Sequence, residues 1–257
     1  MDEIDKKIII ELFRGNTSLR HISKVLKISH QAVHYRLKTH IKNRILKGFS
    51  IYINPNVLGY LHSFIIIKGY DHGYDLPYVT SKFLCIEGYT IYEVIGKSEK
   101  ELEENKKRIL TLTKGEKFME INVNKNISIN NIDKQIIHLL KFNQKIDLGE
   151  LSLKLNLNKS KISNKIKKLF NSDLIKKIPL VDLQRANIVM FSVFSDSYIN
   201  EFNDLEILKF SDSEKTFMIG VSEDMLSLTK RIKNALEENK KFIISIKYDY
   251  NIYENII

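Results

Sequence analysis

One apolar pattern occurs twice in this chain, and its two copies begin 128 residues apart. The triplet Ile-Asp-Lys at 4–6 recurs at 132–134, with matching apolar residues after it. After one inserted residue, the seven apolar positions from Ile22 to Leu46 correspond to the seven from Leu151 to Ile175. This period is half of the 257 residues, which is too long for a solenoid repeat and indicates a duplicated two-domain unit. Residues 122–131, where asparagine dominates, are the predicted linker.

The first fifty residues of each copy show three runs of apolar residues at helical spacing. Ser18 and Ser29 fit as caps of the second and third helices, and Asp147 with Glu150 forms a capping box in the second copy. The joint between the second and third helices, residues 27–29, is very short, which is typical of a helix-turn-helix. The residues expected to face inward in the first copy are Ile4, Ile8 and Leu12, then Leu19, Ile22 and Leu26, then Val33, Leu37 and Ile41.

The rest of each copy alternates as strands do. Residues 49–54 predict a small hairpin strand, a wing. Strand, short helix, strand, strand, helix and strand then follow, which is the βαββαβ order of a ferredoxin-like plait. The expected elements are 64–68, 78–83 (helix), 84–88, 91–95, 98–112 (helix) and 117–124, and in the second copy 188–194, 198–204 (helix), 205–210, 216–221, 224–238 (helix) and 241–248.

The predicted fold class is therefore α+β, a tandem repeat of a winged helix-turn-helix followed by a ferredoxin-like βαββαβ domain. The two helix-turn-helix domains are expected at 1–55 and 128–183, and the two ferredoxin-like domains at 56–127 and 184–257.

A net positive charge is found in only two of these segments. The net charge is +10, but residues 1–50 and 129–178 each carry 11 basic and 4 acidic residues, whereas 51–127 carry 10 of each and 179–257 carry 9 and 13. A biased, archaeal-like usage of lysine, isoleucine and asparagine accounts for a general excess but not for the alternation. Such a modular basic footprint favours a polyanion, and without a lipid-anchor motif it favours nucleic acid over a membrane.

Two other features narrow the class of protein. A single cysteine, Cys85, excludes a disulfide framework within the chain and a cysteine-based zinc cluster. The acidic start, with Asp2, Glu3 and Asp5, is unlike a signal peptide, and no apolar stretch reaches the ~18 residues of a membrane span. We expect a cytoplasmic protein.

Four segments of the first copy resemble the sequences of a known protein family. The sequences Ile4-Asp-Lys-Lys-Ile, Ser29-His-Gln-Ala-Val-His-Tyr-Arg-Leu, Ile45-Leu-Lys-Gly-Phe and Asn54-Pro-Asn-Val-Leu-Gly-Tyr resemble the leucine-responsive regulator (Lrp/AsnC) family at matching spacing. The second copy matches in outline only, because Leu174-Ile-Lys-Lys-Ile-Pro lacks the Gly and the Asn-Pro signature.

The resemblance implies a DNA-binding transcriptional regulator with an N-terminal winged helix-turn-helix and a ferredoxin-like ligand-sensing domain through which members dimerise. An unfused member is about half as long, so this chain resembles a fused pseudo-dimer. The implied partners are double-stranded DNA and, by self-association of the ferredoxin-like domains, another copy.

The chain departs from the family where amino-acid effectors bind. The family holds them at a Gly-x-x-Asp turn, but here Gly88-Tyr-Thr-Ile91 places the apolar Ile91 at the Asp position. The second copy has no glycine between Ser211 and Thr216. An effector site at Gly88 and Ile91 is therefore not expected to hold an amino acid.

The third helix of each copy is the predicted recognition helix, from about His30 to His40 and from Lys159 to Lys168. Glutamine can pair with adenine through two hydrogen bonds in the major groove, and lysine can reach guanine or phosphate. Phosphate contacts position the helix without specifying sequence. The side chains expected to read bases are His30, Gln31, His34, Tyr35 and Lys38, those expected to hold phosphates are Ser29, Arg36, Lys42 and Arg44, and the second helix offers Lys159, Ser160, Ser163, Asn164 and Lys167.

The sequence contains little that indicates a catalytic site or a metal site. His30 and His34 have a spacing that suits one metal, but no Glu lies between them as in a zinc helix and the surroundings are positive, so we expect no metal. No phosphate-binding glycine loop, nucleophile elbow or Cys/His pair is present, so we expect no catalytic residues and no cofactor.

The leading hypothesis is a sequence-specific transcriptional regulator that is not an enzyme, and two alternatives stay open. Proteins similar to this family include sirohaem decarboxylases, which can also be two fused copies and would use histidine and arginine toward the tetrapyrrole carboxylates. The other alternative is an architectural chromatin protein without a preferred site. The histidines and arginines of the expected ferredoxin-like domains are His62, His72, Arg108, Arg185 and Arg231.

Overall fold

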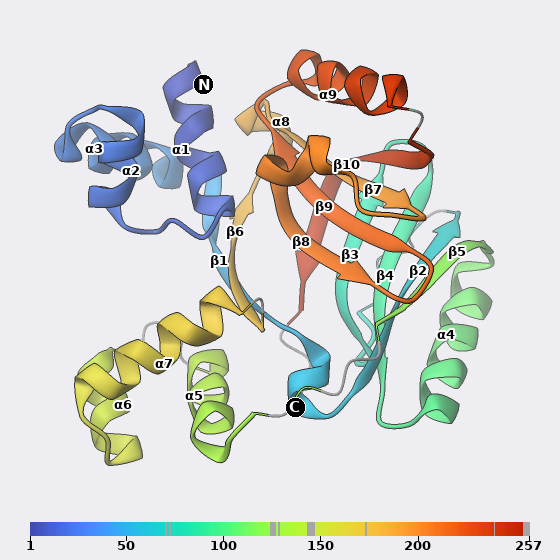
Figure 1. Ribbon diagram of the computed structural model, residues 1–257, viewed down its shortest axis with the longest axis horizontal. Helices are drawn as coiled ribbons and strands as arrows, with labels where there is room; N and C mark the ends of the chain where they lie inside the picture. Colours follow the sequence, from blue (N-terminus) through green and yellow to red (C-terminus); the bar gives the residue numbers. More distant parts are fainter. Residues whose placement is uncertain are drawn as a thin grey trace.

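The two halves of the chain contain closely similar series of helices and strands (Figure 1). The computed structural model describes residues 1–69, 71, 73, 75–123, 127, 129–142, 147–172, 174–238 and 240–253. Each half has three helices, a strand and then a four-stranded plait, so the fold is α+β, with a helix-turn-helix followed by a ferredoxin-like unit, as predicted. The predicted linker, residues 122–131, includes the last two residues of β5 and the first residue of α5, and its residues 124–126 and 128 lie outside the described part.

The first half comprises α1 (Glu3–Phe13), α2 (Leu19–Leu26), α3 (His30–Lys42), β1 (Leu46–Ile53), the 3₁₀ helix η1 (Pro55–Leu58), β2 (Leu61–Lys68), β3 (Val79–Cys85), β4 (Tyr89–Gly96), α4 (Glu99–Thr113) and β5 (Glu116–Val123). The second half comprises α5 (Asn131–Phe142), α6 (Leu148–Leu155), α7 (Lys159–Asn171), β6 (Ile175–Val181), α8 (Leu183–Ala186), β7 (Val189–Ser195), the 3₁₀ helix η2 (Asn200–Leu205), β8 (Glu206–Ser211), β9 (Thr216–Ser222), α9 (Met225–Glu237) and β10 (Phe242–Ile252).

Polar caps fix the start of each recognition helix, because the first N–H groups of a helix lack intrahelical partners. Ser29 Oγ accepts a hydrogen bond from the backbone of Ala32 at 3.1 Å, and Asn158 Oδ1 accepts one from Lys161 at 2.8 Å. The preceding helices end in left-handed residues, Lys27 with φ 54° and Asn156 with φ 50°. The caps predicted at Ser18, Ser29 and Asp147 are all confirmed.

The strand predicted as a wing forms, but its partner is not a hairpin neighbour. Strand β1 pairs antiparallel with β6 of the other half, with Ile51 opposite Lys177, and the two form a separate ribbon. The prediction of a hairpin is wrong because Ile53 is followed by Asn54 and Pro55, which begin a 3₁₀ helix instead of a two-residue turn. The edge of β1 is therefore covered by a distant strand.

The eight remaining strands form one sheet in the order β5-β2-β4-β3-β10-β7-β9-β8, in which each group of four follows ferredoxin-like order and β3–β10 joins the groups. The helix predicted at 78–83 is wrong, since these residues lie mainly in strand β3. The segment from Val79 to Cys85 is rich in β-branched and apolar residues and pairs on both sides, so tertiary pairing favours a strand. The helix predicted at 198–204 forms as the 3₁₀ helix η2.

The two plaits face each other across the main hydrophobic core. Helix α4 packs on the outer face of the first plait, and α9 with η2 packs on that of the second (Figure 1). Between the inner faces, Phe64 lies 4.5 Å from Phe210 and 4.8 Å from Phe217, measured between ring centroids. Edge strands β5 and β8 also contact each other, so the sheet curls toward closure.

Each helix-turn-helix unit packs against the opposite half. Helix α1 contacts β6 and β9, and Arg14 Nη2 donates to the backbone oxygen of Asp204 at 2.9 Å. The core of α5–α7 includes Ile51, Ile53 and Val57 of the first half. Figure 1 shows the two units at opposite ends of the β1–β6 ribbon. We call them the first lobe (α1–α3) and the second lobe (α5–α7).

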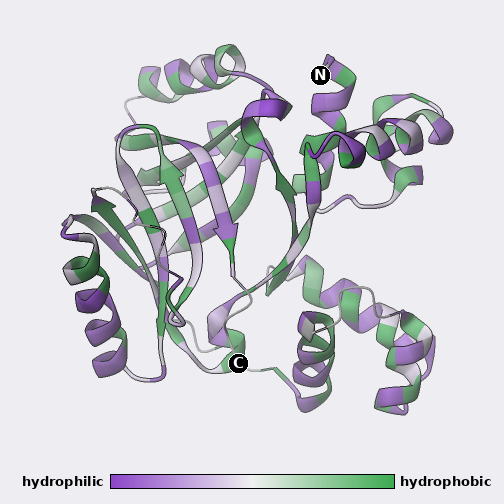
Figure 2. Cartoon of the chain, turned by 180° about the vertical axis from the view of Figure 1, so that it is seen from behind, coloured by the Kyte–Doolittle hydropathy of each residue, from purple (hydrophilic) through white to green (hydrophobic). Residues whose placement is uncertain are grey.

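The lobes expose much polar surface. Figure 2 shows hydrophilic and hydrophobic residues on the same helices of both lobes, as expected for helices with one buried face. Within the described ranges, no helix is long and apolar enough to cross a bilayer.

Candidate nucleic-acid interface

Helix α3 presents all of its predicted base-reading residues to solvent. Val33 is completely buried beneath the helix, and Tyr35 is 73% exposed on the opposite side. All five side chains expected to read bases are exposed: His30, Gln31, His34, Tyr35 and Lys38.

Near the C-terminal end of α3, the residue that faces inward is not the one predicted. Ile41, expected to face inward, is 59% exposed, whereas His40 is 3% exposed. Residues 33, 37 and 40 follow the i, i+4, i+7 spacing of one helix face, so the geometry places the histidine inside. His40 Nε2 lies 3.2 Å from Asp5 Oδ1, and this polar contact makes a buried histidine acceptable.

Arg36 is not available for the phosphate role predicted for it. Its Nη1 lies 2.7 Å from Asp2 Oδ2 and 2.7 Å from Asp5 Oδ1, so it binds α3 to the start of α1. These hydrogen bonds, that of Asp5 first, hold the pKa of Arg36 above its ordinary value. The pKa of Asp2 is lowered because its carboxylate accepts the backbone N–H of Asp5 and a hydrogen bond from Arg36. The sequence did contain a signal for this role: helical spacing places Arg36 between the outward and inward faces of α3.

Three cations on the outward side of the first lobe are not paired with any acid that the structure describes. Lys38, Lys42 and Arg44 are exposed and make no ion pair within the part of the chain that the structure describes. Three acids of this lobe are engaged elsewhere: Glu11 pairs with Arg14 at 2.7 Å, and Asp2 and Asp5 both pair with Arg36. The outward face of α3 therefore keeps its positive charge. Ser29, also predicted to hold phosphate, is exposed while its Oγ caps the helix.

Helix α7 shows the equivalent construction with different outward residues. Lys165 Nζ lies 2.7 Å from Asp133 Oδ1, at the repeat positions of Arg36 and Asp5. Ser163 is half-buried, while the other four predicted residues are exposed. Lys161 and Lys168, which the prediction omitted, are exposed as well. The exposed predicted residues are Lys159, Ser160, Asn164 and Lys167.

The turn that resembles the family's effector site is closed by contacts within the chain. Gly88 adopts φ +79° and Ile91 is completely buried in the main core. Neighbouring Glu87 binds the other half: its Oε2 accepts from Ser245 Oγ at 2.8 Å and its Oε1 from the backbone of Ile246 at 2.9 Å. In the second half, Asp212 Oδ1 fills the corresponding turn by accepting from the backbone N–H groups of residues 214 and 215.

Most of the histidines and arginines that the sirohaem-decarboxylase alternative would use have partners within the chain. His62 is fully buried, with Nδ1 2.8 Å from Glu93 Oε1, which also accepts from Tyr52 at 2.7 Å. Arg231 is paired with Asp204 at 2.6 Å. His72 lies outside the described residues. In the described ranges, no group of three or more His, Cys, Asp or Glu side chains is arranged to hold a metal. The other two arginines also donate hydrogen bonds within the chain, Arg108 to Asn105 Oδ1 and Arg185 to the backbone oxygen of Asn43.

Comparison with known proteins gives relatives over about a quarter of the chain. No profile of a known protein family matches. The chain is 40% identical over 70 residues to the HTH-type transcriptional regulator FL11 of Pyrococcus furiosus, covering 26% of this chain and 46% of that protein. It is 40% identical over 72 residues to the HTH-type transcriptional regulator LrpA of Pyrococcus abyssi, covering 28% and 50%. The chain thus spans about half the length of the curated relatives it matches.

Solved structures show more distant likenesses. The sirohaem decarboxylase NirDL aligns with a TM-score of 0.40 and 10% identity over 97% of this chain and 92% of that one. The leucine response regulatory protein LrpA of Mycobacterium tuberculosis aligns with a TM-score of 0.34 and 23% identity over 50% and 96%. The curated relatives that this chain matches in sequence are Lrp-family helix-turn-helix transcriptional regulators.

Proposed function

We propose that this protein is a sequence-specific DNA-binding transcriptional regulator whose two lobes act on one site as a fused pseudo-dimer. The observation that carries the proposal is the outward face of α3, where exposed side chains suited to base readout lie beside cations that have no acidic partner among the described residues. The relatives named as transcriptional regulators support the same class. We propose no catalytic residue, no cofactor and no metal.

The residues divide into two roles. On α3, Gln31 and His34 stand near the N-terminal end of the helix, which is the end that contacts base edges in helix-turn-helix complexes. Lys42 and Arg44 follow at the other end and would hold phosphates. On α7, lysines predominate, so the second lobe would contribute mainly backbone contacts.

The pseudo-dimer would form within one chain. The inner faces of the plaits already pack against each other, and β3 pairs with β10, so surfaces that two separate chains would use for association are occupied. One ribbon then connects two recognition helices, and the second contact on DNA becomes intramolecular. The matching order of elements in the two halves supports this role, because the third helix of each lobe has a side-chain cap at its N-terminus.

Selection of bound sequences from random duplexes, followed by affinity measurements on the selected site at rising salt, tests the proposal. We expect affinity to fall steeply with salt, because lysines that neutralise phosphates release counterions. Gln31→Ala and His34→Ala should relax sequence preference, whereas Lys42→Ala should weaken binding to every duplex alike. Affinity that hardly responds to salt, or identical effects of the two classes of variant, would contradict the proposal.

A titration with sirohaem separates the regulator from the enzyme. We expect no saturable shift of the Soret band, since His62 is enclosed and the arginines are bound elsewhere. Selection that recovers no preferred sequence despite tight binding would instead favour an architectural chromatin protein.

A further inference from the structure

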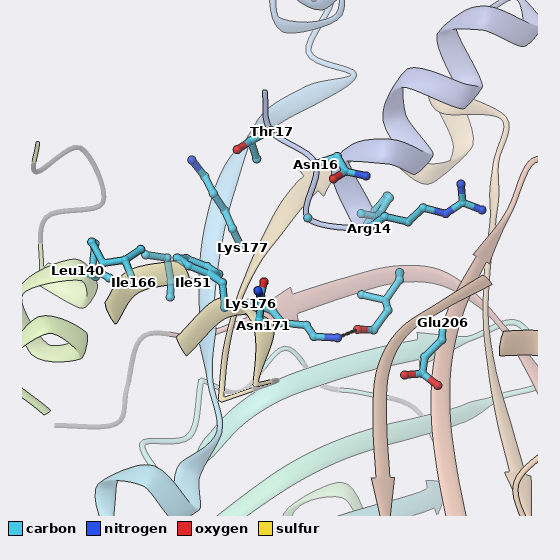
Figure 3. A pocket seen from close by; sticks show the side chains of 14 residues that line it. Arg14, Asn16, Thr17, Ile51, Leu140, Ile166, Asn171, Lys176, Lys177 and Glu206 are labelled. Carbon is cyan, nitrogen blue, oxygen red and sulfur yellow. Dashed lines mark hydrogen bonds between the residues drawn. The ribbon is translucent and has the colours of Figure 1, made fainter. Parts of the chain in front are cut away.

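A cavity of about 580 Å³ lies where the two lobes, the ribbon and the second plait meet (Figure 3). The loop from Phe13 to Thr17 forms the wall on the first lobe, and α5 and α7 form the wall on the second. Strands β1 and β6 and the start of β8 complete it. Its volume is within the roughly 300–1,000 Å³ of pockets that hold small molecules.

One side of the cavity is apolar. Ile51 of the ribbon, Leu140 of α5 and Ile166 of α7 lie together in Figure 3, and Phe170 is a further apolar residue of the lining. Polar side chains occupy other positions, among them Asn16 and Thr17 of the first lobe and Asn171 of the second. A cavity with an apolar wall and a few polar groups suits an amphipathic small molecule.

Lys177 is a cation of the cavity for which the described residues provide no carboxylate partner. Its ammonium lies 4.6 Å from the centroid of the Phe49 ring and makes no ion pair within the described residues. Burial lowers the pKa of Lys177, because the charged form loses hydration without a compensating carboxylate. A bound anion would supply that partner.

The other charged groups of the cavity are already engaged. Lys176 Nζ donates to the backbone oxygen of Ile207 at 2.6 Å, and Arg14 pairs with Glu11 at 2.7 Å. Glu206, the cavity's acidic residue, accepts from Tyr198 at 3.1 Å and lies 3.6 Å from Lys209. Its charge is therefore partly compensated, and Figure 3 shows it away from Lys177.

We propose that this cavity binds a small carboxylate, with its carboxylate on Lys177 and its apolar body against Ile51, Leu140 and Ile166. Neutral or purely inorganic ligands would use only part of the lining. The ligand would touch both lobes at once and so stabilise one separation of the recognition helices. This coupling to DNA rests on the proposed function, whereas ligand binding itself does not. A ligand shifts such an equilibrium only as far as its affinities for the two arrangements differ.

Calorimetry on the full chain without DNA tests the binding site. The probes are phenylacetate, phenylpyruvate, indole-3-acetate and 4-methylpentanoate, each compared with the neutral amide of the same acid, and with inorganic phosphate. We expect at least one carboxylate to bind with a Kd below about 1 mM, and its amide to bind at least about tenfold more weakly. Silence from all four acids, equal affinity of acid and amide, or equal affinity for inorganic phosphate would overturn the proposal.

Variants assign the contact. Lys177→Met should weaken the tightest carboxylate at least about tenfold, Lys177→Arg should retain it because the cation remains, and Lys68→Met on an exposed strand end serves as the matched control. Circular dichroism checks that each variant folds. Unchanged affinity in a folded Lys177→Met, or the same loss in Lys177→Arg, would overturn the assignment of Lys177.

Affinity for the selected DNA site with and without saturating carboxylate tests the coupling. We expect a change of at least about fivefold, which corresponds to roughly 1 kcal/mol of coupling free energy. A ligand that binds and leaves DNA affinity unchanged would overturn the coupling. A chain that binds carboxylates but no DNA would refute the proposed function and leave the binding site standing.

Discussion

Arg36 and Lys165 show how one structural contact is kept while the surrounding surface changes. Each links the third helix of its lobe to the first, Arg36 at 2.7 Å from Asp5 and Lys165 at 2.7 Å from Asp133. Asp2 adds a second acceptor in the first lobe only, at 2.7 Å. The contact restrains the angle of the recognition helix, so its effect on DNA binding would be indirect.

Replacing Arg36 by Ala should therefore reduce stability without removing a phosphate contact. We expect a decrease of about 1 kcal/mol, typical of a partly exposed ion-pair network, and a fall in Tm of about 2–4 °C. The slope of log affinity against log salt should stay unchanged, in contrast to Lys42→Ala, which should reduce it by about one. An equal reduction of the slope in both variants would return Arg36 to the DNA-binding residues.

Tyr250 connects the ribbon to the sheet through its hydroxyl. The hydroxyl donates to the backbone oxygen of Pro179 and accepts from the backbone N–H of Val181 at 2.9 Å. Tyr250 is 5% exposed, and burial raises its pKa. Both backbone groups of β6 would be unsatisfied if the hydroxyl were removed.

Tyr250→Phe should lower the free energy of unfolding by about 1–3 kcal/mol, the cost of leaving buried polar groups unpaired. The matched control is Tyr248→Phe, because Tyr248 is 56% exposed on the same strand. Denaturant unfolding of the two variants checks the expectation. A destabilisation in Tyr250→Phe no greater than that in the control would show that the ribbon does not depend on this hydroxyl.

At the scale of elements, local sequence signals predicted the helices and their caps correctly, but they did not predict which distant strands pair. The helices of both lobes and the caps at Ser18 and Ser29 depend on neighbouring residues, so periodicity and capping chemistry were sufficient. The pairing of β1 with β6 joins residues more than one hundred positions apart, and nothing in either strand specifies the partner. Strand β3 was mistaken for a helix, in part because its pairing with β10 joins residues that are even further apart in the sequence.

The same distinction explains which features of the candidate interface could be predicted from the sequence. The exposed face of α3 followed from helical spacing, whereas the polar partner of His40 and the engagement of Arg36 depend on Asp5 of another helix. The cavity at Lys177 combines segments from both lobes, the ribbon and the second plait, so no local pattern indicated it.

The ribbon makes each lobe depend on a strand from the opposite half. Ile53 of β1 is buried in the core of the second lobe, and Ile178 of β6 is buried in the core that includes the first lobe. Cavity-forming substitutions there should act across the halves. We expect Ile53→Ala and Ile178→Ala each to cost about 2–5 kcal/mol.

Hydrogen exchange measured helix by helix distinguishes the two effects, because local opening reports the stability of each unit. Ile53→Ala should reduce protection in α5–α7 more than in α1–α3, and Ile178→Ala should do the reverse. Each variant is the other's control. A reduction of protection mainly in the lobe of the same half would contradict this crossed packing.

At the scale of the whole molecule, the single chain places one shared sheet and core between α3 and α7, whose outward faces differ. The plaits share one sheet and one core, and the lobes are held at the two ends of the ribbon. A symmetric homodimer would present two identical helices and read a palindrome with half-sites about 10 bp apart or a multiple of that. This chain presents two different faces on a pseudo-symmetric frame.

We therefore expect an asymmetric DNA site with one specified half and one permissive half. Gln31 and His34 offer base-reading groups on α3, while Lys159 and Lys167 on α7 offer mainly charge, and every one of these side chains is exposed. The tether raises the effective concentration of the second lobe, so its weak contacts still add affinity. Footprinting on the selected site with each half scrambled in turn measures this: scrambling the specified half should cost about 1–3 kcal/mol for each mismatched base pair, and scrambling the permissive half should cost little. Equal weakening from either half of a palindromic site would mean that the two lobes read DNA alike and that the difference between their outward faces has no role in recognition.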